Sequence, residues 1–183
     1  MSGYQPDILA KDLTVIFCGL NPGMTAETSG HSFSTPSNRF WTVLHLAGFT
    51  DVRLEPKCER RLLDYRCGIT VVVRRATRRA SEIPLQELRE ARPEFEDRMR
   101  RFAPRSLAFL GKRAYAAMMD VGDVQWGRQP EMFASIATWI LPNPSGLNRS
   151  FTLGALVRAY SELRIALESC GHSPGKKLRS VGF

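Results

Sequence analysis

Two loops of this sequence place glycine, asparagine and proline directly after an apolar run, a pattern that could present polar groups to a ligand. The first loop is Gly19–Gly23, with the sequence Gly-Leu-Asn-Pro-Gly. Its glycines let a ligand approach the backbone closely, while Pro22 fixes the turn and keeps Asn21 out of the helical region. The amide of Asn21 accepts no proton near neutral pH, so it could orient a water molecule but could not act as a strong base. On these residues alone, an ordinary strand-to-loop turn is the favoured interpretation.

The second loop repeats this pattern near the other end of the chain. It has the sequence Asn-Pro-Ser-Gly-Leu-Asn-Arg over residues 143–149 and follows the apolar run 137–141. Gly146 allows close approach of a ligand, and Leu147 offers an apolar side chain that could wedge between stacked bases. Leu147 could instead be a buried anchor of the following helix, but its polar neighbours favour exposure.

Two further stretches could contact a nucleic acid. Phe33 is the one aromatic residue in the polar segment Met24–Ser37. Such a side chain can fold back into the core or stack on a base, and the residues alone leave both readings open. The basic segment Arg74–Arg79 follows another apolar run. We favour phosphate contact for it over an ordinary solvated face, because it lies at the end of a predicted strand.

Apolar runs that alternate with helical patterns must position these loops. Strand-like runs rich in β-branched residues and helix-like i, i+3, i+4, i+7 spacings predict an α/β protein. We expect a three-layer α/β/α architecture with a central, mainly parallel four-stranded sheet. Both loops would then form the walls of one cleft at the carboxyl edge of the sheet, where ligands bind in such folds. The expected strands are 13–18, 69–73, 107–110 and 137–141, the expected helices are 38–47, 84–92, one that opens at residue 93, 113–119 and 152–169, and Trp126–Arg128 is an expected turn.

Length and composition suit one domain. The chain has 183 residues, of which 43% are hydrophobic, enough for a sizeable core. We expect a single catalytic domain over residues 1–170 and a basic, disordered tail over residues 171–183.

The charge balance favours a polyanionic partner. There are 26 Lys and Arg residues against 18 Asp and Glu residues, which gives a net charge of +8. Such an excess promotes binding to nucleic acid through counterion release, although ribosomal, RNA-binding and membrane-surface proteins share it.

We expect cytoplasmic residence, since the sequence shows neither a signal-peptide pattern nor a membrane-spanning run. No Cys-x-x-Cys pair occurs among Cys18, Cys58, Cys67 and Cys170, so we expect no zinc or iron–sulfur site.

Together with Phe33 and the stretch Asn38–Trp41, the two loops closely resemble the mismatch-specific uracil-DNA glycosylases of bacteria, relatives of the thymine-DNA glycosylases. The resemblance covers residues 7–168, and both motifs occur in the order and at the separation of that family. It implies the uracil-DNA glycosylase fold. It also implies an enzyme that flips a base out of the duplex and hydrolyses its N-glycosidic bond.

The resemblance further implies roles for particular residues. Asn21 would orient the attacking water, and Asn143 stands where the fast uracil-DNA glycosylases carry a histidine that supports the charge developing on uracil. Two uncharged amides predict slow chemistry. Phe33 would stack on the flipped pyrimidine, and the backbones of Leu20 and Phe33 would read its edge. The other implied residues are Gly19, Pro22 and Gly23 in the base pocket, Ser145, Gly146, Leu147, Asn148 and Arg149 as the wedge and reader of guanine, and Arg39, Arg75 and Thr77 at phosphates.

One position departs from the family pattern. After Gly68-Ile69-Thr70, family members often carry a polar or ionisable residue, whereas this chain has Val71. Any contribution of that side chain to rate or substrate range would be absent here.

We therefore expect a monofunctional base-excision repair glycosylase that uses no cofactor or metal. Its substrates would be uracil, with thymine and ethenocytosine as further candidates, opposite guanine in double-stranded DNA. We expect a monomer at the bacterial nucleoid, with an abasic-site endonuclease acting downstream. One alternative is a mismatch- or damage-binding protein of the same fold with little or no catalysis. Another is an α/β enzyme acting on a small nucleotide, which would show no salt-dependent duplex affinity and fits the wedge loop less well.

Overall fold

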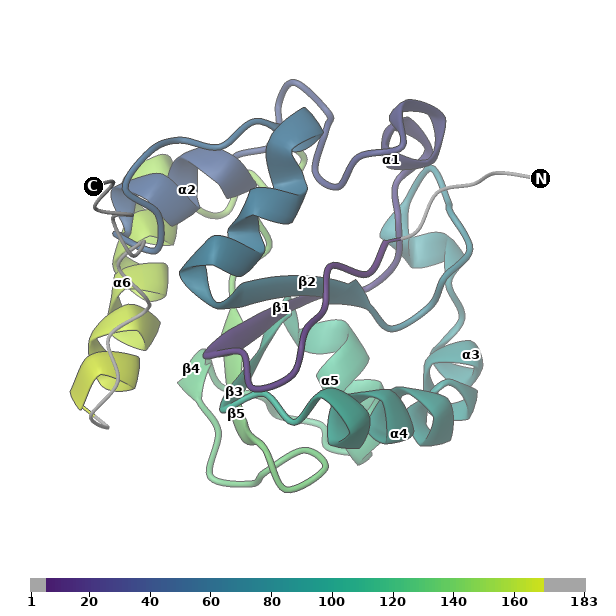
Figure 1. The fold of residues 1–183 in the computed structure, drawn as a ribbon. Coiled ribbons are helices and arrows are strands. Elements are labelled where there is room, and N and C mark those ends of the chain that lie inside the picture. Colours follow the sequence, from purple (N-terminus) through teal and green to yellow (C-terminus); the bar gives the residue numbers. More distant parts are fainter. Residues whose placement is uncertain (1–5, 170–183) are drawn as a thin grey trace.

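The computed structural model of the protein describes residues 6–169, which build a five-stranded, mostly parallel sheet with the order β2-β1-β3-β5-β4 (Figure 1). Four strands run parallel, and a short fifth strand pairs antiparallel with the edge of the sheet. This confirms the predicted α/β fold with its mainly parallel sheet. The strands are β1 (Val15–Gly19), β2 (Cys67–Val71), β3 (Ser106–Leu110), β4 (Gly127–Arg128) and β5 (Ala137–Leu141).

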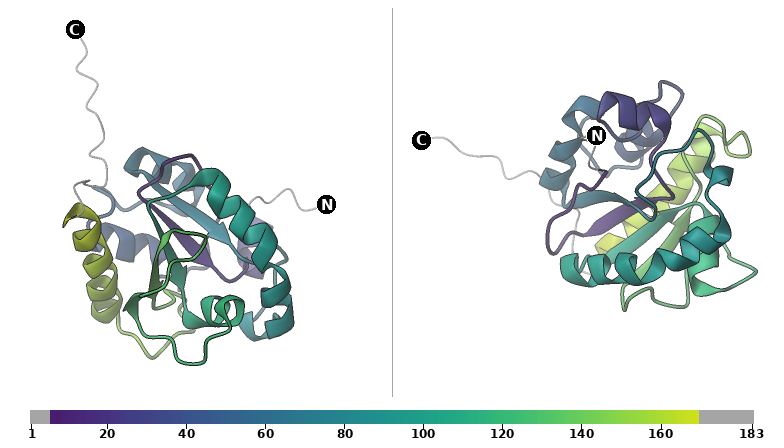
Figure 2. Two further views of the ribbon diagram at one scale, coloured as in Figure 1. Left: turned by 90° about the horizontal axis from the view of Figure 1, so that it is seen from below. Right: turned by 90° about the vertical axis from the view of Figure 1, so that its right-hand side faces the viewer.

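Helices cover both faces of the sheet and give the molecule three layers (Figure 1; Figure 2). Two separate apolar clusters, one on each face, hold these layers together. One face carries α2 (Phe40–Leu46), the 3-10 helix η1 (Pro56–Tyr65) and α6 (Leu153–Ser169), and the other carries α3 (Leu85–Glu90), α4 (Arg92–Phe102) and α5 (Lys112–Met119).

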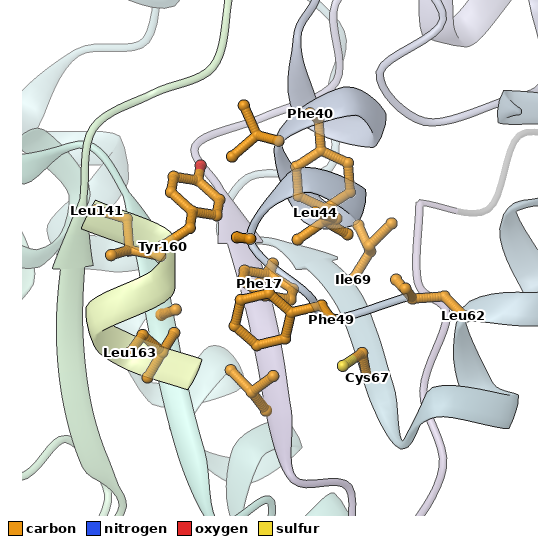
Figure 3. Close-up of a cluster of buried hydrophobic side chains, with 14 of the residues drawn as sticks. Phe17, Phe40, Leu44, Phe49, Leu62, Cys67, Ile69, Leu141, Tyr160 and Leu163 are labelled. Carbon is orange, nitrogen blue, oxygen red and sulfur yellow. The ribbon is translucent and has the colours of Figure 1, made fainter. Parts of the chain in front are cut away.

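The central strands are apolar along their whole length because each of their faces is covered. Every residue of β1 is buried, and successive side chains point to opposite layers. Phe17 packs edge-on against Phe40 and Phe49 and stacks on Tyr160 of α6 (Figure 3). Its neighbour Ile16 joins the cluster on the opposite face. The core therefore fixes β1, the strand that delivers the first loop.

The structure differs from the expected elements in three places. The segment Trp126–Arg128 is predicted to be a turn, but two of its residues, Gly127 and Arg128, form strand β4 and pair antiparallel with β5. A short helix, α1 (Met24–Ser29), lies in the segment expected to be loop, and of its residues only Ala26 is buried. The 3-10 helix η1 precedes β2, in a segment for which the sequence predicts no helix.

The parallel strands bring three loops to one edge of the sheet. The pairing of Gly19 with Val71 and of Leu110 with Leu141 aligns the carboxyl ends of these strands. The loops after β1, β2 and β5 therefore meet at this edge. Within residues 6–169, no helix is long and apolar enough to cross a membrane. The predicted tail, together with Cys170, lies outside the described residues.

Candidate active site

A cleft of about 630 Å³ opens where the three loops meet. It is lined by the loop after β1, by α1 and residues 32–38, by residues 77–80 and by the loop after β5. Its polar groups are amides, hydroxyls, peptide groups and the guanidinium groups of Arg78 and Arg79. None of the described residues that line it is an aspartate, glutamate, histidine, cysteine or lysine. The described lining therefore offers no side chain that takes up or gives up a proton near neutral pH, and chemistry in this cleft must rely on hydrogen-bonding groups, on the charge of the two arginines and on water.

Asn21 lines the cleft in a fixed orientation. Its Nδ2 donates to the backbone oxygens of Pro22 at 3.1 Å and Arg75 at 3.0 Å, and to Thr77 Oγ1 at 2.8 Å. Because the two backbone oxygens can only accept, the atom that faces them must be the nitrogen. Oδ1 is thereby left as a hydrogen-bond acceptor for a molecule in the cleft.

Thr77 holds this orientation from the loop after β2. Its side chain accepts from Asn21 and donates to the Arg79 backbone oxygen at 2.9 Å, and the residue is only 5% exposed. Its backbone N–H donates to the Pro22 oxygen at 3.2 Å, which ties the two loops together. With its hydroxyl occupied inside the protein, Thr77 is placed to position Asn21 rather than to make the predicted phosphate contact.

Phe33 presents an aromatic face beside the cleft. One face of its ring stacks on Phe40 of α2, with centroids 3.9 Å apart and planes inclined by 24°. The residue is half-buried and also lines the cleft, so it combines both sequence-based alternatives: its ring rests on the core and also borders the cleft. Trp41 is buried beside this pair.

The loop after β5 is internally hydrogen-bonded. Asn143 Oδ1 accepts from Ser145 N at 2.9 Å, so the carboxamide oxygen faces the backbone and Nδ2 remains as a donor. Ser145 Oγ accepts from Leu147 N at 3.2 Å, and Asn148 Nδ2 donates to the Asn143 backbone oxygen at 2.9 Å. These bonds shape a compact turn whose tip is Leu147.

Leu147 is the most exposed large apolar side chain of the described residues, with 81% of its surface accessible. This excludes the alternative of a buried helix anchor. Gly146, next to it, packs so closely on Ser37 that an added Cβ would lie 2.5 Å from the Ser37 side chain. Arg149, two residues after Leu147, is also exposed.

Arg39 supports this loop from within. Its guanidinium donates to the backbone oxygens of Phe151 at 2.6 Å, of Ser145 and Asn148 at 2.9 Å each, and of Pro144 at 3.3 Å. An arginine so engaged has little capacity left for DNA. The structure thus favours a loop-positioning role over the predicted phosphate contact.

The arginines after β2 differ in their availability. Arg75 forms a two-bond ion pair with Glu87, with distances of 2.7 and 2.6 Å, and does not line the cleft. Arg78 is exposed, lines the cleft and forms no hydrogen bond or ion pair with another described residue. We therefore regard Arg78 as the better phosphate ligand of this segment. Sequence alone could not separate them, since the difference lies in Glu87 on a distant helix.

The other predicted pocket residues also lie at the cleft. Gly19, Leu20, Pro22 and Gly23 line one wall, and a Cβ added to Gly23 would meet no atom within 4 Å, so its face is open. Val71, the departure from the family pattern, lines the cleft as well and contributes only apolar surface.

Nothing in the described residues suggests metal or thiol chemistry at this site. They contain no group of three or more histidine, cysteine or acidic side chains placed to hold a metal ion. Burial raises the pKa of Cys67 to about 12 and raises the pKa of Cys18 further, so both remain thiols at neutral pH.

Comparison with known protein families assigns this architecture. The family model described as the uracil DNA glycosylase superfamily matches residues 6–164. This span contains the whole sheet and both loops that build the cleft. The chain therefore belongs to the uracil DNA glycosylase superfamily, a membership that supports DNA glycosylase activity in base-excision repair.

Proposed function

We propose that the protein hydrolyses the N-glycosidic bond of uracil mispaired with guanine in double-stranded DNA and leaves an abasic site. The observation that carries this proposal is the pairing, in one cleft, of a fixed Asn21 acceptor with the available face of Phe33. Thymine and ethenocytosine opposite guanine are further candidate substrates. No lysine lines the cleft among the described residues, which favours hydrolysis by water over a covalent amine intermediate.

Base extrusion is assigned to the loop after β5. A glycosidic bond inside a stacked duplex is out of reach, so the nucleotide must leave the helix. The exposed Leu147 can fill the space left by the base, as apolar wedges do in other DNA-bending proteins. Backbone groups of 146–149 beside this wedge are proposed to read the orphaned guanine. Flipping a nucleotide costs about a few kcal/mol, and the cost is lowest for a mispaired base. The weaker pairing of a mismatch therefore contributes to the selectivity of the enzyme.

The flipped base would lie between Phe33 and Asn143. Stacking on the available face of Phe33 holds any pyrimidine, since every base has a π-face. Asn143 Nδ2 can donate to a carbonyl oxygen of the base, where negative charge develops as the bond breaks. A neutral amide stabilises that charge less than a cationic donor would, so we expect slow chemistry.

Water would attack from the side of Asn21. Oδ1 can accept a hydrogen bond from a water molecule and direct its lone pair at the sugar carbon. The amide does not take up the proton of the attacking water, which passes to the departing base anion or to bulk water, so orientation is the whole contribution of Asn21. Because the cleft holds no carboxylate among its described residues, no stronger base is available to replace it.

The decisive experiment is single-turnover base release from matched duplexes that contain G·U, A·U or G·T, with Asn21→Ala alongside. We expect release from G·U, weaker release from A·U, and a fall of about a hundredfold or more in the variant. Equal rates on G·U and A·U would show that the wedge loop does not read guanine. Tight binding to G·U duplex without release would establish the alternative, a damage-binding protein of the same fold.

We further propose that the protein works as a monomer on cytoplasmic, nucleoid DNA, and that an abasic-site endonuclease consumes its product. The basic charge of the chain supports association with DNA.

A further inference from the structure

Glu59 is a buried carboxylate that neither loop motif includes. It lies in η1, on the face of the sheet that carries α2, and is only 8% exposed. Its Oε2 accepts from the backbone N–H of Ser32 at 2.6 Å, and its Oε1 lies 3.3 Å from His31 Nδ1. An ionised carboxylate can only accept, so His31 is the donor in the second pair. Both hydrogen bonds of Glu59 within the described residues therefore go to the segment that leads into Phe33.

The same segment is held from a second direction. Trp41 Nε1 of α2 donates to the backbone oxygen of Ser32 at 3.3 Å. The N–H and the C=O of Ser32 are thus bound by side chains from two different elements. Phe33 follows directly with a φ of +54°, a left-handed conformation that non-glycine residues adopt only when their surroundings enforce it.

We propose that Glu59 is a positioning residue that holds Phe33 in the conformation that stacks on the flipped base. The proposal rests on the function proposed above, since it takes Phe33 as the base platform. A carboxylate suits this task because its charge is costly to bury without partners. If the 31–33 segment moved away, the buried charge of Glu59 would lose both hydrogen-bond partners. The cost of leaving that charge without partners therefore opposes movement of the segment.

The test uses three variants of the full chain. Glu59→Ala removes both hydrogen bonds to the 31–33 segment, and Glu59→Gln retains an oxygen that can accept from Ser32 N. Asp64→Ala is the matched control, because Asp64 is an exposed carboxylate of the same 3-10 helix without a hydrogen bond to another described residue.

Two duplex ligands distinguish a misplaced Phe33 from a general loss of structure. The first carries a 2′-fluorinated deoxyuridine opposite guanine, which can be flipped but resists cleavage because fluorine destabilises positive charge on the sugar. The second carries tetrahydrofuran, an abasic analogue, at the same position. Only the first ligand places a base against Phe33, so only its affinity depends on the platform.

We expect Glu59→Ala to bind the fluorinated duplex about tenfold more weakly, in line with the loss of base–aromatic stacking. Its affinity for the tetrahydrofuran duplex should stay within about twofold of that of the unaltered protein, because no base is stacked there. Release of uracil from G·U should fall in parallel. Glu59→Gln keeps an acceptor for Ser32 N but loses the buried charge, so it should restore both only in part. Asp64→Ala should behave like the unaltered protein in every assay.

Several outcomes would overturn this role. Equal weakening on both duplexes would mean that Glu59 merely supports the fold, and unchanged affinity for both would mean that Phe33 needs no clamp. If Glu59→Ala does not fold, Trp41→Phe breaks the other hydrogen bond to Ser32 and must show the same difference between the ligands. Absence of uracil release by the unaltered protein would instead refute the proposed function, which keeps the two failures distinct.

Discussion

The two asparagines of the cleft are chemically identical but are held in opposite senses. Asn21 has its nitrogen bound to protein acceptors and offers oxygen, whereas Asn143 has its oxygen bound to a backbone N–H and offers nitrogen. An acceptor suits a water molecule, and a donor suits the carbonyl oxygen of a departing base. In the function proposed above, their neighbours therefore give the two residues different roles, Asn21 toward water and Asn143 toward the base.

Thr77→Val tests whether the orientation of Asn21 matters for the rate. Valine keeps the shape of threonine but removes the hydroxyl that accepts from Asn21 Nδ2. One hydrogen bond of this kind contributes about 1 kcal/mol, so single-turnover release from G·U should fall about fivefold to tenfold. Affinity for the duplex should not change. Thr77→Ser keeps the hydroxyl and should retain the rate, and a Thr77→Val protein as fast as the original would refute this role.

Leu147→Ala tests the wedge without touching the core. Because the side chain is 81% exposed, the free energy of unfolding should change by no more than about 0.5 kcal/mol. Release from a G·U duplex should fall at least about tenfold, since part of the flipping cost of about a few kcal/mol is no longer offset. Release from uracil in a single-stranded oligonucleotide should be unaffected, because there is no stack to open. An equal loss on both substrates would contradict a wedge.

At the scale of elements, the loop after β5 is the most heavily supported part of the site. Arg39, at the start of α2, bonds four of its backbone oxygens, and Tyr160 of α6 donates to the Pro142 oxygen at 3.1 Å. Burial raises the pKa of Tyr160 well above its usual range, so this donor keeps its proton at any working pH. Two helices thus brace the loop that we propose to insert into DNA.

Arg39→Lys should weaken this support although the charge is conserved. A lysine has three donors on one nitrogen and cannot reach the same fan of oxygens as a planar guanidinium. We expect unfolding in urea to show a loss of about 2–3 kcal/mol, together with faster proteolytic cleavage within residues 143–151. Arg158→Lys, on an exposed position of α6, is the control and should change neither. Unchanged stability of Arg39→Lys would mean that the four bonds contribute little.

These elements show how far the sequence alone could lead. Apolar runs located all four parallel strands, and their alternation with helices placed both loops at one edge, because burial on two faces leaves a strong local signal. The two-residue strand β4 and the helix α1 carry no such signal, being too short and too exposed. The roles of Arg39 and Thr77 were also out of reach, since their partners lie in other loops. Whether an arginine faces solvent or a backbone oxygen is decided by tertiary structure.

On the scale of the whole molecule, charge is arranged so that none of the described residues lining the cleft has a negative side chain. The chain has a net charge of +8, yet several arginines are neutralised locally, such as Arg75 by Glu87 and Arg98 by Asp7. Only cations without such a partner can release counterions on binding DNA. Among the residues that line the cleft, Arg78 and Arg79 meet this condition, since neither forms an ion pair with another described residue.

The salt dependence of duplex binding should therefore distinguish these arginines. Removing one phosphate contact lowers the slope of log K against log of salt concentration by about one. We expect that reduction for Arg78→Gln. The double variant Arg75→Gln with Glu87→Gln removes both members of an ion pair without altering the net charge, so its slope should match that of the original protein. If the double variant instead lost as much slope as Arg78→Gln, Arg75 would have to leave Glu87 for a phosphate in the complex. Such a result would support the phosphate contact that the sequence predicts for Arg75.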